Sequence, residues 1–300
     1  MTNVGAKQAD MLDGVKRLFG LSRPALPAQQ DWLVSPPRPE RSLESPVITA
    51  ARNLPHGAVC GDDLRRAIDV EVRNRRAAAN MLDGPASPTL SGELTVRSDG
   101  LPSWWRDNGN LLICPADLPE IKLELAMTPI PPRGALVVAG RDARPGTLQF
   151  HGERALAVFG DRIVLSVSSV SVAHGAVLIG AGTTATFMAR LDCRNGGVII
   201  AGADCMWAAG VNLLTDDCHT IRDLATGKRV NRYGGRIMIE DHVWLGEQVR
   251  LMGDCRIGRD SIVGMGSFVK NAVLPTNTIS VGRPARPVRF GVTWTREDIP

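Results

Sequence analysis

The sequence predicts a mainly β fold, a left-handed parallel β-helix, because a pattern repeats every six residues between positions 239 and 273. One aliphatic residue leads each repeat, at Ile239, Leu245, Leu251, Ile257, Val263 and Val269. Four positions after each lead stands a small or β-branched residue, at Val243, Val249, Cys255, Ser261, Ser267 and Val273. Helices and alternating strands have periods of 3.6 and 2 residues and would not produce this pattern. An ordinary pair of buried strands is the remaining alternative, and six consecutive matches disfavour it.

In this fold each six-residue repeat forms one flat side of a triangular coil, and three repeats complete the coil. Successive coils stack about 4.8 Å apart, which is the spacing of hydrogen-bonded strands. We therefore expect the lead residues to point inward and the small residues to fit the corners. Gly follows three of the leads, at Gly246, Gly258 and Gly264, and permits backbone angles that a side chain would forbid.

The composition suits one large domain or two ordinary ones in a chain of 300 residues. Aromatic residues make up only 4% of the sequence, which agrees with a narrow interior filled by aliphatic side chains. The formal net charge of +4 favours an anionic ligand but is too small to indicate nucleic-acid binding. The six cysteines form no C-x-x-C pair, so neither a zinc knuckle nor a redox dithiol is indicated, and no metal is expected. Scattered thiols in a chain of this size are typical of a reducing compartment.

The sequence divides into four parts. Residues 1–50 combine a short amphipathic helix at 6–20 with a proline-rich linker. This helix could pack on its own domain, touch a membrane surface peripherally or contact a glycosyltransferase. The sequence contains neither a signal peptide nor a transmembrane run of about 20 apolar residues, so we expect a cytoplasmic protein. The other parts are a small α/β region of unknown role at 51–132, the β-helix at 133–292 and a tail at 293–300.

The α/β region begins with a predicted helix at 62–82, which the two Asp residues at its start could cap. The alternating runs GELTVRSDG and NLLICPADLPEIKLELAM after it predict strands. The adjacent Trp104 and Trp105 fit either a surface on which a sugar stacks or, more commonly, one buried and one half-buried anchor. No catalytic motif occurs before residue 130.

From residue 134 the sequence consists of short β-rich pieces separated by Gly and polar turns, which predicts irregular early coils. Further leads are predicted here, with slips of phase between them, at Ile179, Ala185, Leu191, Ile200 and Met206. The repeat then fails altogether at 213–236, in LLTDDCHTIRDLATGKRVNRYGGR. Functional residues concentrate in such excursions from a regular framework, so this loop is the first place to look for a site.

The residues of this loop and of the repeats after it resemble the hexapeptide-repeat acyltransferases, and among them the sugar and polysaccharide O-acetyltransferases. The matching stretches are DDCHTI at 216–221, IMIEDHVWLG at 237–246 and IGRDSIVGMGSFVKNAVLPTNTISVGRPAR at 257–286. They are similar to the family patterns D-x-H-[ST]-I, I-G-D-H-V-W-I-G, G-A-G-S-V-V-T-K and G-N-P-A-K. The resemblance covers residues 197–292. It implies a homotrimer that transfers acetyl from acetyl-CoA to a sugar or to an exopolysaccharide, capsule or lipopolysaccharide unit, with each site shared between protomers.

The D-x-H match places His219 at the family's general base. Transfer to a hydroxyl needs a base that is neutral near pH 7, and imidazole has that pKa unperturbed. Asp217 could orient the ring, although both residues could instead form turns within the loop. The resemblance places Trp244 beside the base, where its indole could donate a hydrogen bond and exclude water, or pack between subunits. His242 in the same motif is expected to be structural.

The resemblance also assigns a donor groove along the last repeats. Small residues would let the pantetheine arm approach closely, and cations would bind the phosphates of CoA. The residues assigned to this groove are Gly246, Gly264, Gly266, Ser267, Lys270, Arg283 and Arg286. GRPAR at 282–286 replaces the usual G-N-P-A-K, so the contact at Arg283 departs from the family pattern. Plain solvated surface is the alternative for these cations.

Several other functions remain as alternatives. An N-acyltransferase acting on an amino sugar and a non-catalytic trimeric scaffold both fit the repeat. A carbonic anhydrase on this fold would need three zinc-binding histidines, and the five histidines here lack the spacing. A fused nucleotidyltransferase is disfavoured because no glycine-rich phosphate loop precedes the repeat. Cys218, beside His219, could be acylated, but transfer without a covalent intermediate is expected.

Overall fold

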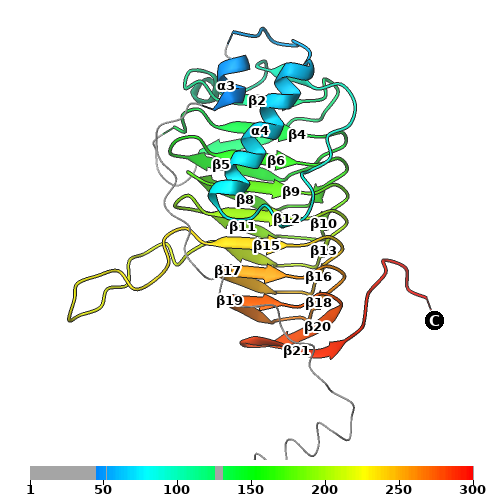
Figure 1. The fold of residues 1–300 in the computed structure, drawn as a ribbon. Coiled ribbons are helices and arrows are strands. Elements are labelled where there is room, and N and C mark those ends of the chain that lie inside the picture. The colour runs from blue at the N-terminus through cyan, green and yellow to red at the C-terminus, as the bar shows by residue number, and fades with distance from the viewer. Residues whose placement is uncertain (1–44, 52, 126–130, 300) are drawn as a thin grey trace, which may run out of the picture. The chain divides into compact units, whose positions relative to one another are not determined.

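The structure is a computed structural model that describes residues 45–51, 53–125 and 131–299. The predicted helix at 6–20 and the linker before residue 45 lie outside the described residues. The strands stack as the coils of a parallel β-helix (Figure 1). The predicted mainly β, left-handed β-helix is therefore confirmed.

The stack has three faces, each a ladder of parallel strands. The helix face comprises β4 (Leu136–Ala139), β6 (Leu156–Phe159), β9 (Ala176–Ile179), β12 (Val198–Ala201) and β15 (Arg236–Ile239). The loop face comprises β3 (Lys122–Leu125), β5 (Thr147–His151), β8 (Ser169–Ala173), β11 (Arg190–Cys193) and β14 (Asn212–Leu214). The tail face comprises β7 (Val164–Leu165), β10 (Thr184–Ala185), β13 (Met206–Trp207), β16 (Trp244–Leu245), β18 (Ile262–Val263) and β20 (Thr278–Gly282). Two longer strands, β17 (Arg250–Ile257) and β19 (Phe268–Leu274), turn a corner, and β17 joins the loop face and the helix face into one 14-stranded sheet.

The repeat after residue 236 has the predicted phase. All six predicted leads from Ile239 to Val269 are at most 1% exposed and line the interior. In the second row Val273 is only half-buried, whereas the other five residues are buried. The cause is a register shift, because β19 has one residue fewer than β17 at the corner and Leu274 takes the inner position. The earlier predicted leads Ile179, Ala185 and Leu191 are also buried.

Two predicted leads, Ile200 and Met206, are wrong by one residue. Ile179 pairs in register with Ala201, so the inward positions of this coil are Ala201 and then Trp207. Ile200 points outward beneath the covering helix, and Met206 points outward on the tail face. The coil between Ile179 and Ala201 has a longer turn than the later coils. A strict six-residue period therefore misplaces the inward positions after this turn.

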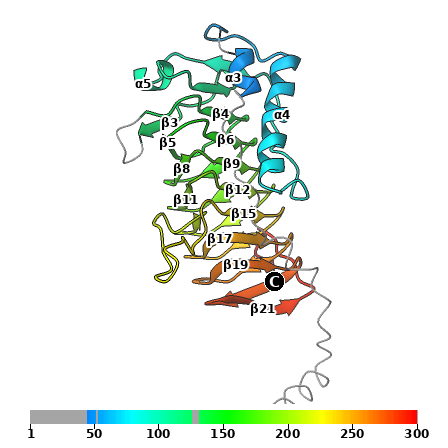
Figure 2. The same cartoon turned by 60° about the vertical axis from the view of Figure 1, so that its left-hand side comes forward.

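Helix α4 (Asp62–Ala78) covers the helix face, as Figures 1 and 2 both show. Its buried residues Leu64, Ile68 and Val72 recur every four positions and so form one apolar side. This cover explains why strands β4, β6, β9 and β12 are buried on both sides. The two Asp residues lie in the first turn and suit its dipole. The predicted capping is wrong, since the N-cap is Gly61 and no side chain caps the helix.

The parallel stack begins earlier than the boundary placed at residue 133. Strand β1 (Thr95–Arg97) pairs antiparallel with β2 (Leu111–Cys114), and β2 already pairs parallel with β4. Two short helices belong to this end, α3 (Pro46–Ala51) and α5 (Ser103–Arg106). Trp105 is fully buried against Phe150, whereas Trp104 is half-buried, so the pair acts as structural anchors.

The other end of the stack is closed by β21 (Ala285–Phe290), which turns back to pair antiparallel with β20. The tail segment, residues 291–299, then leaves β21 and returns toward earlier coils (Figure 1, red). Its contacts lie along the corner between the helix face and the tail face.

Candidate active site

The excursion from the repeat is an ordered loop, residues 215–235, that projects from the stack between β14 and β15 (Figure 1, yellow). Asp216 is 3% exposed and anchors the part of the loop that joins the coils. Its carboxylate accepts hydrogen bonds from the backbone N–H groups of Cys218 at 2.8 Å and Gly234 at 3.2 Å, and from the amide of Asn195. Both ends of the loop are thereby tied to one buried carboxylate.

The outer part of the loop is a short antiparallel hairpin. The Val230 N–H donates to the Ile221 carbonyl at 2.9 Å, and Arg222 and Arg229 form a β-bridge. Asp223 makes the turn at the tip, where its carboxylate accepts from the N–H of Thr226 at 2.7 Å. The loop therefore has its own hydrogen-bonded framework.

Asn231 fixes the segment that carries His219. Its amide nitrogen donates to the Asp217 carboxylate at 3.1 Å and to the His219 carbonyl at 2.7 Å. Its amide oxygen accepts from the Ile221 N–H at 2.9 Å. Sequence reasoning missed this residue, and the only available signal was a polar side chain on the returning strand of the loop.

His219 itself is exposed, and within the described residues its imidazole has no hydrogen-bond partner. The backbone N–H of His219 donates to the carbonyl of Asp217 at 2.8 Å, which keeps the turn tight. The Asp217 carboxylate lies 3.6 Å from the ammonium of Lys270 and contacts Asn231. Asp217 therefore steadies the loop base in this chain, with no contact to the imidazole that it was expected to orient.

Trp244 lies on the tail face, with its side chain pointing outward and 36% exposed. His219, Asp217 and Lys270 belong to the loop face and the loop that leaves its edge. The structure thus brings Asp217 and Lys270 together but leaves Trp244 on another face of the same chain.

The glycines assigned to the donor groove have roles in the coil itself. A Cβ at Gly246 would lie 2.7 Å from the backbone nitrogen of Met265, and one at Gly264 would lie 2.7 Å from the side chain of Val281. Gly266 has a φ of +68°, which L side chains adopt rarely. The buried hydroxyl of Ser267 accepts from the Gly282 N–H at 3.1 Å. Coil-to-coil packing therefore requires small residues at these corners.

The predicted phosphate-binding cations fall into two groups. Arg283 and Arg286 lie at the end of the tail face, where Arg283 Nε donates to the Gly266 carbonyl at 2.6 Å and Arg286 Nη1 to the Ala285 carbonyl at 2.9 Å. Both side chains are otherwise exposed. Lys270 lies on the loop face beside Asp217. Only the two arginines share an edge with Gly264 and Gly266.

Cys218 is a poor nucleophile in this setting. It has a φ of +64° and sits between Asp216 and His219 at the loop base. Burial raises the pKa of its thiol, and the carboxylates of Asp192 and Asp216 add to this, against an opposing effect of Arg194. The reactive thiolate is therefore disfavoured.

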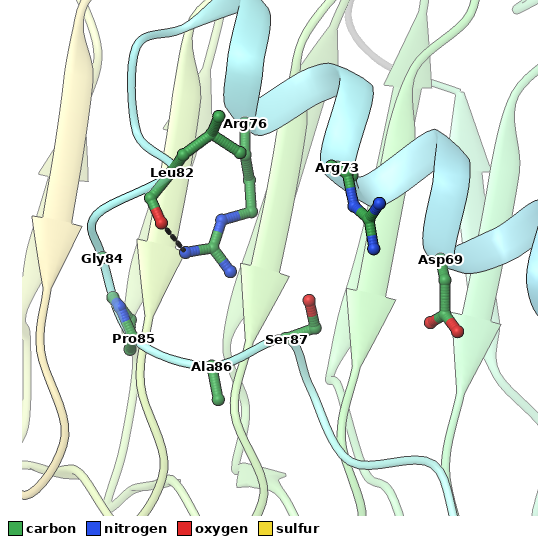
Figure 3. A pocket seen from close by; sticks show the side chains of 8 residues that line it. All are labelled: Asp69, Arg73, Arg76, Leu82, Gly84, Pro85, Ala86 and Ser87. Atoms are coloured by element: carbon green, nitrogen blue, oxygen red, sulfur yellow. Dashed lines mark hydrogen bonds between the residues drawn. The ribbon is translucent and has the colours of Figure 1, made fainter.

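The cavity drawn in Figure 3 lies elsewhere, between α4 and the segment that follows it. It has a volume of about 340 Å³ and is lined by Asp69, Arg73, Arg76, Leu82, Gly84, Pro85, Ala86 and Ser87. The guanidinium of Arg76 donates to the Leu82 carbonyl at 3.5 Å and so holds the two walls together. None of the predicted site residues lines this cavity.

No group of three or more His, Cys, Asp or Glu side chains in the described part of the chain is arranged to hold a metal ion. No helix among these residues is both long enough and apolar enough to cross a membrane.

Comparison with known proteins places the repeat. Residues 236–271 match the family model described as bacterial transferase hexapeptide (six repeats). A polysialic acid O-acetyltransferase of Escherichia coli O1:K1 / APEC is 32% identical over 124 residues, which are 41% of this chain and 39% of the relative. The galactoside O-acetyltransferase of Lactococcus lactis subsp. lactis (strain IL1403) is 34% identical over 86 residues, 29% of this chain and 40% of the relative. The chain thus spans less than half the length of the curated relatives it matches.

A solved structure supports the architecture. The polySia-specific acetyltransferase NeuO has a TM-score of 0.52 at 24% identity, over 63% of this chain and 86% of that chain. The chain is therefore a left-handed β-helix protein that carries the bacterial transferase hexapeptide repeat at residues 236–271.

Proposed function

We propose that this chain is an O-acetyltransferase that moves acetyl from acetyl-CoA to a hydroxyl of a sugar or of a cell-surface polysaccharide. Its relatives named above are O-acetyltransferases of polysialic acid and of galactosides, which supports a carbohydrate acceptor. The observation that carries the proposal is His219, an exposed imidazole on an ordered loop beside the hexapeptide repeat.

The chemistry follows from an imidazole held outside the coils. His219 would take the proton of the acceptor hydroxyl as its oxygen attacks the thioester carbonyl. When the carbon–sulfur bond breaks, the imidazolium would return that proton to the departing thiolate of CoA. Backbone N–H groups or the indole of Trp244 would stabilise the oxyanion. No covalent enzyme intermediate is needed, which agrees with the raised thiol pKa of Cys218.

The donor would lie along the end of the tail face. Arg283 and Arg286 are exposed there beside the glycine corners, and their guanidinium groups suit phosphate oxygens. Among the described residues, only the guanidinium of Arg283 lies within 4 Å of where a side chain of Gly266 would begin, which suits the close approach of a narrow pantetheine arm.

The site would be shared between copies in a homotrimer, because His219 and Trp244 occupy different faces of one chain. An apolar edge supports this assembly. Val167, Phe187, Met188 and Met265 project at the corner between the tail face and the loop face and are 72%, 45%, 56% and 74% exposed. Val167 and Met188 have φ values of +47° and +52°, where Gly, Asn or Asp is usual. Apolar residues in such strained, exposed positions suit a surface that another copy covers.

The cytoplasm is the proposed compartment. All six cysteines are free thiols, as expected of a protein in a reducing environment.

The test is a screen of sugars, nucleotide sugars and oligosaccharides for a mass gain that depends on acetyl-CoA, run beside His219→Ala. Loss of a general base should lower kcat by about 10²–10⁴-fold. His56→Ala, a change in the N-terminal part far along the sequence from the loop, is the matched control and should retain activity. Full activity of His219→Ala would overturn the role of His219, and acetylation of amino sugars alone would change the reaction to N-acylation.

A further inference from the structure

The tail segment is fastened to a line of corners on the coils by specific side-chain contacts. Asn277 exchanges hydrogen bonds of 3.2 Å with Val292 on the last coil. The indole N–H of Trp294 donates to the His242 carbonyl at 2.8 Å. Arg296 reaches an earlier coil, where it donates to the Asp204 carboxylate at 3.0 Å and to the Cys205 carbonyl at 3.1 Å.

His242 is the centre of this attachment. Its ring stacks on Trp294 with centroids 4.1 Å apart and an angle of 5° between the planes. One ring nitrogen, Nδ1, lies 2.8 Å from a carboxylate oxygen of Asp204. The other, Nε2, lies 2.9 Å from the carbonyl oxygen of Trp294. A neutral imidazole has only one N–H and can satisfy one of these two oxygens.

Proton counting assigns the charge state of the ring. A carbonyl oxygen only accepts, and Asp204 is kept as a carboxylate because its second oxygen accepts from Arg296. Both ring nitrogens of His242 must therefore donate, so the geometry is that of an imidazolium.

We propose that residues 291–299 form a pH-dependent clasp, which protonated His242 closes over the tail face and which fixes Trp294 beside Trp244. The ring centroids of Trp294 and Trp244 are 6.2 Å apart at an angle of 53°. Trp294 is 8% exposed, and the guanidinium of Arg296 lies 5.7 Å from its ring centroid. His242 and Trp294 thereby act as positioning residues for Trp244, and this last step rests on the role of Trp244 in the proposed function.

The charges around His242 favour the closed clasp. Asp204 faces it from the preceding coil, Asp260 from the following coil and Arg296 from the clasp itself. Burial lowers the pKa of His242, but the Trp294 carbonyl and the Asp204 carboxylate outweigh it and raise the pKa above the ordinary value of about 6.5. The clasp is thus fully closed below that ordinary value and opens as the pH rises through the raised pKa.

The first experiment measures the protonation of His242 and the opening of the clasp, without any acetyl acceptor or donor. NMR titration of the histidine side chains should give His242 a pKa above 6.5, which Asp204→Asn lowers. Trypsin can cut after Arg296 only when this side chain leaves Asp204, so the release of the residues after Arg296 reports opening. The rate is followed by intact mass and divided, at each pH, by that of a free peptide with the sequence of residues 290–299.

For the wild-type protein this normalised rate should rise as the pH passes the raised pKa of His242. His242→Gln should be cut at the faster rate at every pH. His174→Gln is the matched control, because His174 occupies a similar corner with a φ of +53° against +55° for His242 and lies outside the clasp. It should behave like the wild type.

A flat normalised rate, or equal rates for His242→Gln and the wild type, would overturn the clasp. A second outcome concerns Trp244 alone. If acetyl transfer occurs, its kcat should fall as the clasp opens with rising pH. The pH profile of His242→Gln should lack this fall in kcat. An opening clasp with an unchanged kcat profile would overturn the positioning of Trp244. Because the cleavage assay needs no acetyl transfer, failure of the proposed function would leave the clasp result intact.

Discussion

At the residue scale, Asn231 connects the two strands of the loop around His219 with three hydrogen bonds. Asn231→Ala removes all three, and Asn231→Asp keeps only the acceptor for the Ile221 N–H. We predict that the alanine variant lowers kcat by about ten- to a hundredfold, because a misplacement of about 1 Å costs that much. The aspartate variant should lose a similar factor in kcat, since neither alanine nor aspartate can donate to the His219 carbonyl. Steady-state kinetics beside thermal unfolding checks this, and an unchanged kcat in both variants would contradict it.

Cys218 gives a second prediction at this scale. Its thiol pKa is raised by burial, so the thiol stays protonated at neutral pH and direct transfer needs no cysteine. Cys218→Ser keeps the size and the polar character of the side chain, and we expect its kcat to stay within about twofold of the wild type. Intact mass after exposure to acetyl-CoA alone should show no acetylated protein. A covalent adduct that the serine variant lacks would favour a two-step mechanism.

At the element scale, α4 stabilises the β-helix by covering the helix face. Ile68 is 2% exposed in this contact, whereas Val70 on the same helix is 43% exposed. Ile68→Ala should lower the free energy of unfolding by about 2–4 kcal/mol through lost burial and a cavity. Val70→Ala should change it by less than about 0.5 kcal/mol. Urea unfolding measures both, and equal effects would mean that α4 does not contribute to the core.

The loop shows how far an element can be predicted from its sequence. A broken repeat located it, and the D-x-H motif singled out His219 and Asp217. The hairpin and the Asn231 contacts could not be predicted, because they depend on which side chains the turn at Asp223 brings face to face. The partners of Asp217 were also unpredictable, since Lys270 is a neighbour only through coil stacking.

At the scale of the whole molecule, the sequence reveals the fold where the coils have equal length. Ile239 pairs with Ile257 eighteen residues later, which is three repeats of six. Ile179 pairs with Ala201 after twenty-two residues, so the same stacking is hidden from a count in sixes. Inward aromatic residues such as Trp207 and Phe150 also hide the repeat, because the pattern expects an aliphatic residue at each inward position.

The proposed site is shared between copies of the chain. His219 and Trp244 lie on different faces, and the apolar edge with Val167 and Met188 is exposed. If two copies complete each site, a defect in one residue can be compensated by a neighbour that carries the other.

The most direct test is complementation between His219→Ala and Trp244→Ala, each inactive alone and co-expressed with different tags so that mixed oligomers can be purified. In every mixed trimer about one third of the shared sites, one of the three, would combine an intact His219 with an intact Trp244. We therefore predict that the mixed oligomers recover about a third of the wild-type rate of acetyl transfer. Mixed oligomers, verified by native mass spectrometry, that stay as inactive as their parents would contradict a site shared between copies.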